Sequence, residues 1–345
     1  FLVLSACTIA EETQTDRHMD WPAFQGNGHR NQYAPLNQIH TGNVDQLTLA
    51  WEYHTGDSGQ MQCNPIIIDG ILYGMTAAVQ PFALKADTGE EIWRIHADSS
   101  ENFLSTSRGL VYWENGSDKR ILYSHESWLM ARDAVTGNLI ESFGDSGRVS
   151  LKAGLGPTAQ DKFVISNTPG TVFEDLIIMP LRVSEGPDAA PGDIQAFNIR
   201  TGEIAWVFHT IPHPEEEGYD TWPPDAYQNN VGVGAVNNWA GIAVDRERGI
   251  LYVPTGSAAF DFYGGNRPGT NLYANTLLAL DARTGKKIWH YQMVHHDILD
   301  RDPPAAPNLL TIKRDGKSID AVAQITKQGY VFLFDRENGT PLFNI

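Results

Sequence analysis

The sequence predicts an all-β fold and, within that class, a β-propeller. Five copies of one strand–turn motif recur along the 345 residues, glycine (32) and proline (19) are frequent, and no long segment has helical periodicity. Glycine and proline supply the tight turns that a chain of short strands needs. Repeats of roughly 40–50 residues that each hold several strands are typical of propeller blades.

Each copy of the motif is an alternating apolar strand followed by a turn, a glycine and usually an aromatic residue. The five copies are FALKADTGEEIW (82–93), LMARDAVTGNLIESF (129–143), IQAFNIRTGEIAW (194–206), LLALDARTGKKIW (277–289) and VFLFDRENGTPLF (331–343). Alternation with a period of two predicts a half-buried strand, and the Thr-Gly or Asn-Gly pair predicts a turn with positive φ. We therefore expect Trp93, Trp206 and Trp289 to be wedged between neighbouring sheets, where a large aromatic ring buries most area.

Further strands are expected between the motifs, at residues 64–75, 171–180 and 249–256. We interpret residues 21–345 as one propeller rather than two domains. The sequence stops shortly after the fifth motif with no closing segment, and an open ring would leave an exposed edge strand. The chain is therefore expected to be either a five-bladed ring or the first part of a larger one.

Composition excludes some classes of partner. The chain is 41% hydrophobic, as globular proteins are, and its net charge is −17 with no basic cluster. This charge argues against binding to nucleic acid or to anionic lipid surfaces. No segment after the N-terminus approaches the roughly 20 apolar residues that span a bilayer.

The N-terminus, FLVLSAC, is an apolar run that ends at Cys7 and resembles a bacterial lipobox, cut after Ala6 and acylated on Cys7. We expect residues 1–7 to be the end of a truncated lipoprotein signal peptide and residues 8–20 to be a polar tether. A fragment of an ordinary signal sequence or a core strand is the alternative. The lipobox predicts the bacterial periplasm, with membrane attachment through a lipid anchor only. The second cysteine, Cys63, stands alone, so no disulfide framework is predicted.

The Ala-x-Asp-x-x-Thr-Gly-x-x-x-Trp motif resembles the tryptophan-docking repeat of quinoprotein dehydrogenases, which are eight-bladed propellers that hold pyrroloquinoline quinone (PQQ). Local resemblance continues along nearly the whole chain, from WPAFQGNGHRNQYAPLNQIH to VHHDILDRDPPAAPNLL, and the glucose-dehydrogenase-like branch is the most similar. The resemblance implies that residues 21–345 are a partial propeller of about 4–5 blades from the eight-bladed ring. It also implies oxidation of a sugar or alcohol CH–OH group by hydride transfer to PQQ, with an Asp base and a divalent metal.

The resemblance assigns the cofactor and metal contacts to four loops. Trp239 in NNWAG would be the flat floor under PQQ, and Arg108 in SRGLVYW and Thr168 in SNTPG would contact its carboxylates. Glu185 in RVSEG would bind the metal, either Ca²⁺ or another divalent or lanthanide ion. Each residue has a plainer alternative: a core tryptophan, a surface arginine, a turn-capping threonine and an ordinary loop glutamate.

The stretch HHDILDRDPP (295–304) concentrates charge after a strand pattern. The resemblance makes Asp300 the catalytic base and a metal ligand, and makes Lys327 in QITKQGY a catalytic cation that hydrogen-bonds the quinone. These two residues converge only if adjacent blades face one axis. Asp302 could add a metal ligand. His295 and His296 are expected to be structural, since adjacent strand residues point to opposite faces, and Asp297 is expected to support the loop.

Some family features are missing from this sequence. There is no adjacent-cysteine pair, no histidine before FAL in AAVQPFAL, and no Cys-x-x-Cys-His haem motif. The missing histidine puts glucose in doubt as the substrate. The missing haem motif means that the electron acceptor, a membrane quinone or cytochrome c, is expected either elsewhere or in the missing part of the protein. Arg182 stands where relatives carry a small hydroxyl residue and could contact a further carboxylate.

Two other functions stay open: a cofactor-free propeller lipoprotein that acts as a protein-binding scaffold in envelope assembly, and a truncated product without function. The coincidence of motif-matched acids, cations and a tryptophan favours the enzyme.

Overall fold

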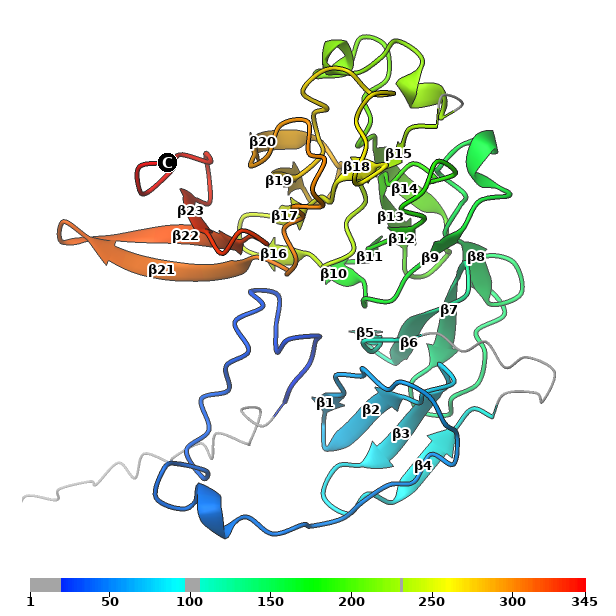
Figure 1. The fold of residues 1–345 in the computed structure, drawn as a ribbon. Coiled ribbons are helices and arrows are strands. Elements are labelled where there is room, and N and C mark those ends of the chain that lie inside the picture. Colours follow the sequence, from blue (N-terminus) through cyan, green and yellow to red (C-terminus); the bar gives the residue numbers. More distant parts are fainter. Residues whose placement is uncertain (1–19, 97–105, 230–231) are drawn as a thin grey trace, which may run out of the picture.

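The computed structural model describes residues 20–96, 106–229 and 232–345, which form a succession of small antiparallel sheets set around a common centre (Figure 1). Cys7, the predicted lipobox and most of the predicted tether lie outside the described residues. Among the described residues no helix is long and apolar enough to cross a membrane. Their helices are single 3₁₀ turns: η2 (Val44–Gln46), η3 (Pro157–Ala159), η4 (Tyr219–Thr221) and η5 (Ala226–Gln228).

The first two sheets each have four strands in sequence order. The first consists of β1 (Ile66–Ile68), β2 (Ile71–Met75), β3 (Pro81–Lys85) and β4 (Glu91–Arg94). The second consists of β5 (Val111–Asn115), β6 (Asp118–His125), β7 (Trp128–Asp133) and β8 (Arg148–Ser150).

The next sheets repeat the pattern with longer connections between strands. The third contains β10 (Thr171–Phe173), β11 (Leu176–Met179), β13 (Ile194–Asn198) and β14 (Ile204–Phe208). The fourth contains β16 (Ala243–Asp245), β17 (Ile250–Pro254), β19 (Thr276–Asp281) and β20 (Lys287–Gln292). The fifth has three described strands, β21 (Asn308–Arg314), β22 (Lys317–Ile325) and β23 (Val331–Asp335).

Two short strand pairs lie in these longer connections: β9 (Val164–Ile165) with β12 (Arg182–Val183), and β15 (Gly234–Ala235) with β18 (Ala258–Ala259). The strands expected at residues 64–75, 171–180 and 249–256 are present, which confirms the all-β propeller prediction. The number of blades in the complete ring stays a prediction.

The tryptophans of the repeat connect each sheet to the next. The indole Nε1 of Trp93 at the end of the first sheet donates to the carbonyl of Ala134 in the second, at 3.0 Å. Gly137 lies against the same indole with φ +74°, and a Cβ there would stand 2.8 Å from the ring. The motif therefore needs glycine both for its turn and for this close approach. Trp206 and Trp289 make the equivalent bond to the following sheet, at 3.2 Å in each case, which confirms the predicted wedges.

The N-terminal described segment ties distant sheets together. Trp21 pairs through its backbone with Ile67 of the first sheet. Arg30 is 2% exposed and donates to the carbonyl of Ile242 at 2.9 Å and to the hydroxyl of Thr171 at 2.7 Å. The segment thus bridges the first, third and fourth sheets, and it helps to hold the inter-sheet loops in register.

Candidate functional site

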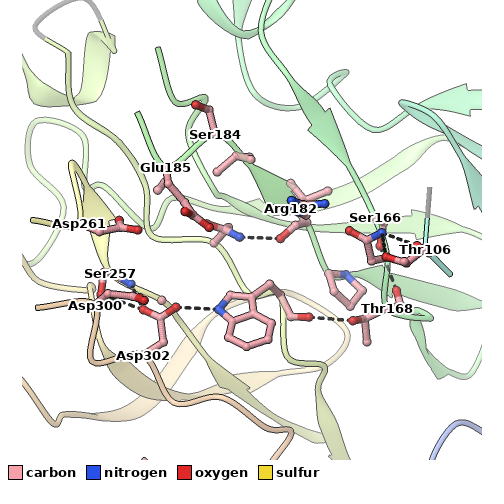
Figure 2. Close-up of a pocket in the computed structure, with 18 of the residues that line it drawn as sticks. Thr106, Ser166, Thr168, Arg182, Ser184, Glu185, Ser257, Asp261, Asp300 and Asp302 are labelled. Carbon is pink, nitrogen blue, oxygen red and sulfur yellow. Dashed lines mark hydrogen bonds between the residues drawn. The ribbon is translucent and has the colours of Figure 1, made fainter. Parts of the chain in front are cut away.

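A cavity of about 610 Å³ lies where loops from successive sheets converge (Figure 2). Figure 2 shows Asp261, Asp300 and Asp302 toward one end of the cavity and Thr106, Ser166 and Thr168 toward the other. Every residue that the sequence assigned to cofactor, catalysis or metal lines this cavity: Arg108, Thr168, Glu185, Trp239, Asp300 and Lys327.

Trp239 follows β15, and both its ring and its backbone are held in place. Its indole Nε1 donates to Asp302 Oδ2 at 2.8 Å, and its carbonyl accepts from the hydroxyl of Thr168 at 2.7 Å. The guanidinium carbon of Arg108 lies 5.8 Å from the ring centroid, and the Lys327 ammonium lies 6.0 Å from it. An aromatic ring is thus fixed with two cationic groups close to it.

Lys327 and Asp300 form an ion pair inside the cavity. Lys327, in the turn between β22 and β23, donates from Nζ to Asp300 Oδ1 at 2.6 Å and lies 3.6 Å from Asp302 Oδ2. Burial by itself would lower the pKa of Lys327, but the hydrogen bond to Asp300 and the charges of both aspartates outweigh burial and raise it. The lysine is therefore held as a cation.

Asp297 fixes the loop that carries Asp300. It is 3% exposed, and its oxygens accept the backbone N–H groups of Leu299 at 3.1 Å and Arg301 at 2.6 Å. These two donors flank Asp300, whose φ of +52° is in the left-handed region. Ser257 also donates to Asp297, at 2.6 Å. The expected loop-supporting role of Asp297 is confirmed.

Asp302 is engaged on both oxygens. Oδ1 accepts from the backbone N–H of Ser257 at 2.6 Å and lies 2.8 Å from the Ser257 hydroxyl, whose single proton is shared with Asp297, while Oδ2 accepts from Trp239. Asp302 is also 8% exposed. These contacts make it a positioning residue for the indole.

Arg108 and Arg182 add positive charge to the lining of the cavity. Arg108 donates to the Thr168 hydroxyl at 2.7 Å, and burial together with the nearby Arg182 lowers its pKa. No carboxylate of the described chain lies within ion-pair distance of either guanidinium. Unpaired guanidinium groups on a cavity wall suit a ligand with carboxylates.

The family described as "PQQ: Glucose/ethanol/alcohol dehydrogenase, beta-propeller domain" matches residues 21–345. The chain belongs to this family of PQQ-dependent dehydrogenases. It is 32% identical to the quinoprotein glucose dehydrogenase of Escherichia coli (strain K12), over 96% of this chain and 44% of that relative. The Acinetobacter calcoaceticus quinoprotein glucose dehydrogenase A, at 33% identity over 94% of this chain and 44% of its own length, likewise supports the glucose-dehydrogenase-like branch.

Solved structures agree with this family of PQQ-dependent dehydrogenases. A quinohemoprotein alcohol dehydrogenase from Pseudomonas putida HK5 superimposes with a TM-score of 0.80 at 26% identity, over 94% of this chain and 47% of that one. The Comamonas testosteroni quinohemoprotein alcohol dehydrogenase gives a TM-score of 0.79, also at 26% identity, over 94% and 48%. The chain thus spans less than half the length of these relatives.

The 610 Å³ cavity also contains residues that the sequence did not indicate. Asp261 is 7% exposed, and its pKa is raised to about 7 by burial and by the negative charges of Asp302, Asp300 and Glu185. Ser257 connects Asp297 with Asp302. Both lie in GSAAFDFYGG, where only the folded loops bring them to the carboxylates, so no local signal marked them.

The two histidines of the loop that carries Asp300 are not on a strand. His295 and His296 lie in bends after β20, so the reasoning from strand alternation was wrong. His296 has φ +48°, and its Nδ1 lies 2.8 Å from the Gly269 carbonyl, which anchors the loop. Among the described residues no three His, Cys, Asp or Glu side chains are grouped closely enough to hold a metal.

Proposed function

We propose that this chain is the cofactor-holding part of a PQQ-dependent dehydrogenase that oxidises the CH–OH group of a sugar or an alcohol. One observation carries the proposal: two cationic side chains, Arg108 and Lys327, lie within about 6 Å of the Trp239 ring centroid, and Lys327 also pairs with Asp300 at 2.6 Å. An aromatic plane, a cation and a carboxylate on one cavity are the parts that quinone-dependent alcohol oxidation needs. The family and its named relatives support this function over a cofactor-free scaffold.

The residues present fit PQQ, which is flat and carries three carboxylates. The Trp239 face can stack on it, and Arg108 and the unpaired Arg182 offer donors to its carboxylates. Thr168 would have to turn its hydroxyl proton away from the Trp239 carbonyl to donate to a carboxylate. The cavity volume of about 610 Å³ is ordinary for a small-molecule site. When bound, PQQ would supply the two-electron acceptor that takes a hydride from the substrate carbon.

Asp300 is the proposed base. It would accept the substrate's hydroxyl proton, while Lys327 keeps a positive charge beside that carboxylate and can also donate to an anionic oxygen. Asp297 holds the loop around Asp300 and so fixes the direction of its carboxylate. Asp302 holds the indole plane of Trp239 in place through its hydrogen bond to Nε1.

Glu185 and Asp300 are the proposed metal ligands. Both are oxygen donors on the same cavity, which suits Ca²⁺, and another divalent or a lanthanide ion would use the same donor type. Two carboxylates do not complete a coordination shell, so further oxygens would have to come from the cofactor or water. Glu185→Gln is expected to raise the Ca²⁺ concentration that half-activates the PQQ-loaded enzyme, with PQQ binding measured separately.

We further propose a periplasmic location for this protein, with Cys7 as the lipid attachment site. The electron acceptor would then be a membrane quinone or a cytochrome c. Mass spectrometry of the N-terminal peptide from membrane fractions would detect the acyl chains on Cys7, and an unmodified cysteine there would contradict the anchor.

The decisive experiment uses the full-length protein reconstituted with PQQ and Ca²⁺. Dye-linked oxidation of a panel of sugars and alcohols is compared between the native protein, Asp300→Asn and Asp315→Asn, a matched change at an exposed hairpin turn. Loss of the general base is expected to lower turnover on the order of 10²–10⁴-fold in Asp300→Asn only. Full activity in that variant would exclude Asp300 as the base, and failure of the native protein to retain PQQ would favour the scaffold.

A further inference from the structure

A second cavity, of about 480 Å³, shares no lining residue with the first. One wall is the loop around η3, after β8, and the other walls come from the start of β13 and the long connection after β14. The residues that matter for its chemistry are Leu155, Pro157, Asp193, His209, His213 and Tyr227. None of them has a role in the proposed oxidation.

Asp193 supplies a buried negative charge to this cavity. Its side chain belongs to a residue that is 5% exposed, and Oδ1 accepts from the backbone N–H of Thr210 at 2.9 Å. No donor in the described parts of the chain contacts the other oxygen, Oδ2. Burial raises the pKa of Asp193 to about 6, although nearby His209 opposes the shift. Oδ2 is not fully enclosed by protein and opens onto the cavity, so a ligand with a donor or a positive charge can reach it.

An aromatic wall stands in the same cavity. The rings of His209 and His213 are stacked, with centroids 3.7 Å apart and planes within 3°. Tyr227 tilts against His213 with centroids 5.1 Å apart. Burial, with the neighbouring His209, lowers the pKa of His213, so that this ring presents a neutral face.

The imidazoles are not arranged to chelate a metal. Stacked parallel rings direct their nitrogen lone pairs side by side rather than toward one point, and His209 Nδ1 already lies 2.9 Å from Glu216 Oε1. Glu216 also accepts from the backbone N–H of His213 at 2.7 Å. The charge of Glu216 is thus used within the protein, which leaves Asp193 as the acid that can serve a ligand.

The remaining surface of the cavity is mostly apolar: beside the polar Thr158 and Gln228 it is lined by Leu155, Pro157, Pro191, Ile211 and Ala226. Apolar and aromatic walls around one buried carboxylate match a ligand with a positive charge and a hydrocarbon surface. The net charge of −17 also raises the local concentration of cations. We propose that this cavity is a second ligand site, which binds a small alkylammonium cation with Asp193 as counter-ion and His213 and Tyr227 as aromatic walls.

The test uses tetramethylammonium as the probe and tert-butanol as its uncharged counterpart of similar size. Neither compound has a CH–OH group, so neither is a substrate for the first cavity. Isothermal titration of the full-length protein without PQQ is expected to show one-to-one binding of tetramethylammonium, at least about tenfold tighter than tert-butanol. Absence of tetramethylammonium binding, or equal binding of the two compounds, overturns the proposal.

Matched variants locate the binding. Asp193→Asn keeps an acceptor for Thr210 but removes the charge, and is expected to weaken tetramethylammonium binding at least about tenfold. Tyr227→Leu, at a half-buried position, is expected to weaken tetramethylammonium binding severalfold. This variant provides the test if Asp193→Asn fails to fold. Asp315→Asn, at an exposed hairpin turn, should bind normally. Asp300→Asn should also bind tetramethylammonium normally. Weaker binding in this variant would show that the probe binds in the first cavity, which would overturn the proposal.

Discussion

The indole nitrogen of Trp239 donates a 2.8 Å hydrogen bond to Asp302, a residue 63 positions further along the chain. Asp302 stands two residues after Asp300, and its other oxygen is held by Ser257. The ring that forms the cavity floor and the loop that carries the proposed base are therefore one hydrogen-bonded unit. Movement of either one would be transmitted to the other.

Asp302→Asn should disturb the position of the Trp239 ring more than the proton transfer to Asp300. An amide carries one acceptor oxygen where the carboxylate has two, so either Ser257 or Trp239 would face an N–H₂ group. We expect a loss of stability of about 1–3 kcal/mol and weaker PQQ binding. Thermal unfolding and quenching of tryptophan fluorescence by PQQ would measure the two effects. Asp315→Asn, at an exposed hairpin turn, is the control and should keep PQQ affinity; unchanged PQQ binding in Asp302→Asn would contradict this role.

Lys327 should stabilise the fold in a pH-dependent manner. Its folded-state pKa is raised above the ordinary value of 10.5, because the bond to Asp300 and the charge of Asp302 outweigh burial. The stabilisation is therefore fully present below pH 10.5 and is lost as the pH rises through the higher, folded-state pKa. Thermal melts of the native protein and Lys327→Met should differ at pH 7–9 and converge in strong alkali. A difference that does not depend on pH would mean that Lys327 stabilises through packing alone.

Binding of tetramethylammonium should strengthen as the pH rises through about 6, the raised pKa of Asp193. The protonated acid offers no charge to the cation, and the ligand's own charge does not titrate. His209, His213 and Glu216 are the other titratable groups beside the cavity, so the dependence is compared with Asp193→Asn. We expect the variant's titrations at pH 5 and pH 7.5 to give nearly the same affinity. An equal pH dependence in both proteins would assign the effect to the histidines.

The repeat made the sheets predictable, whereas the loops between sheets were not. Strand alternation, Thr-Gly turns and the tryptophans are local features, and Trp93, Trp206 and Trp289 each bond to the following sheet. Asp300 and Lys327 were found through family resemblance, because nothing local to either residue indicates that they meet. Other features depend on contacts between different sheets, and no periodicity in the sequence predicts them. These features are the hydrogen bond from Trp239 to Asp302, the burial of Asp261 and the cavity at Asp193.

The tryptophan–glycine contact should account for much of the cohesion between sheets, and two glycines allow a matched test. Gly285 has φ +70°, and a Cβ there would stand 2.5 Å from the Trp206 ring; Gly316 has φ +74° with open space around it. Gly316→Ala should therefore cost only the backbone strain, about 1 kcal/mol. Gly285→Ala adds displacement of a buried indole and should lower the free energy of unfolding by a further 1–3 kcal/mol or so. Urea denaturation of both variants measures the difference, and equal losses would show that the indole contributes little to joining the third and fourth sheets.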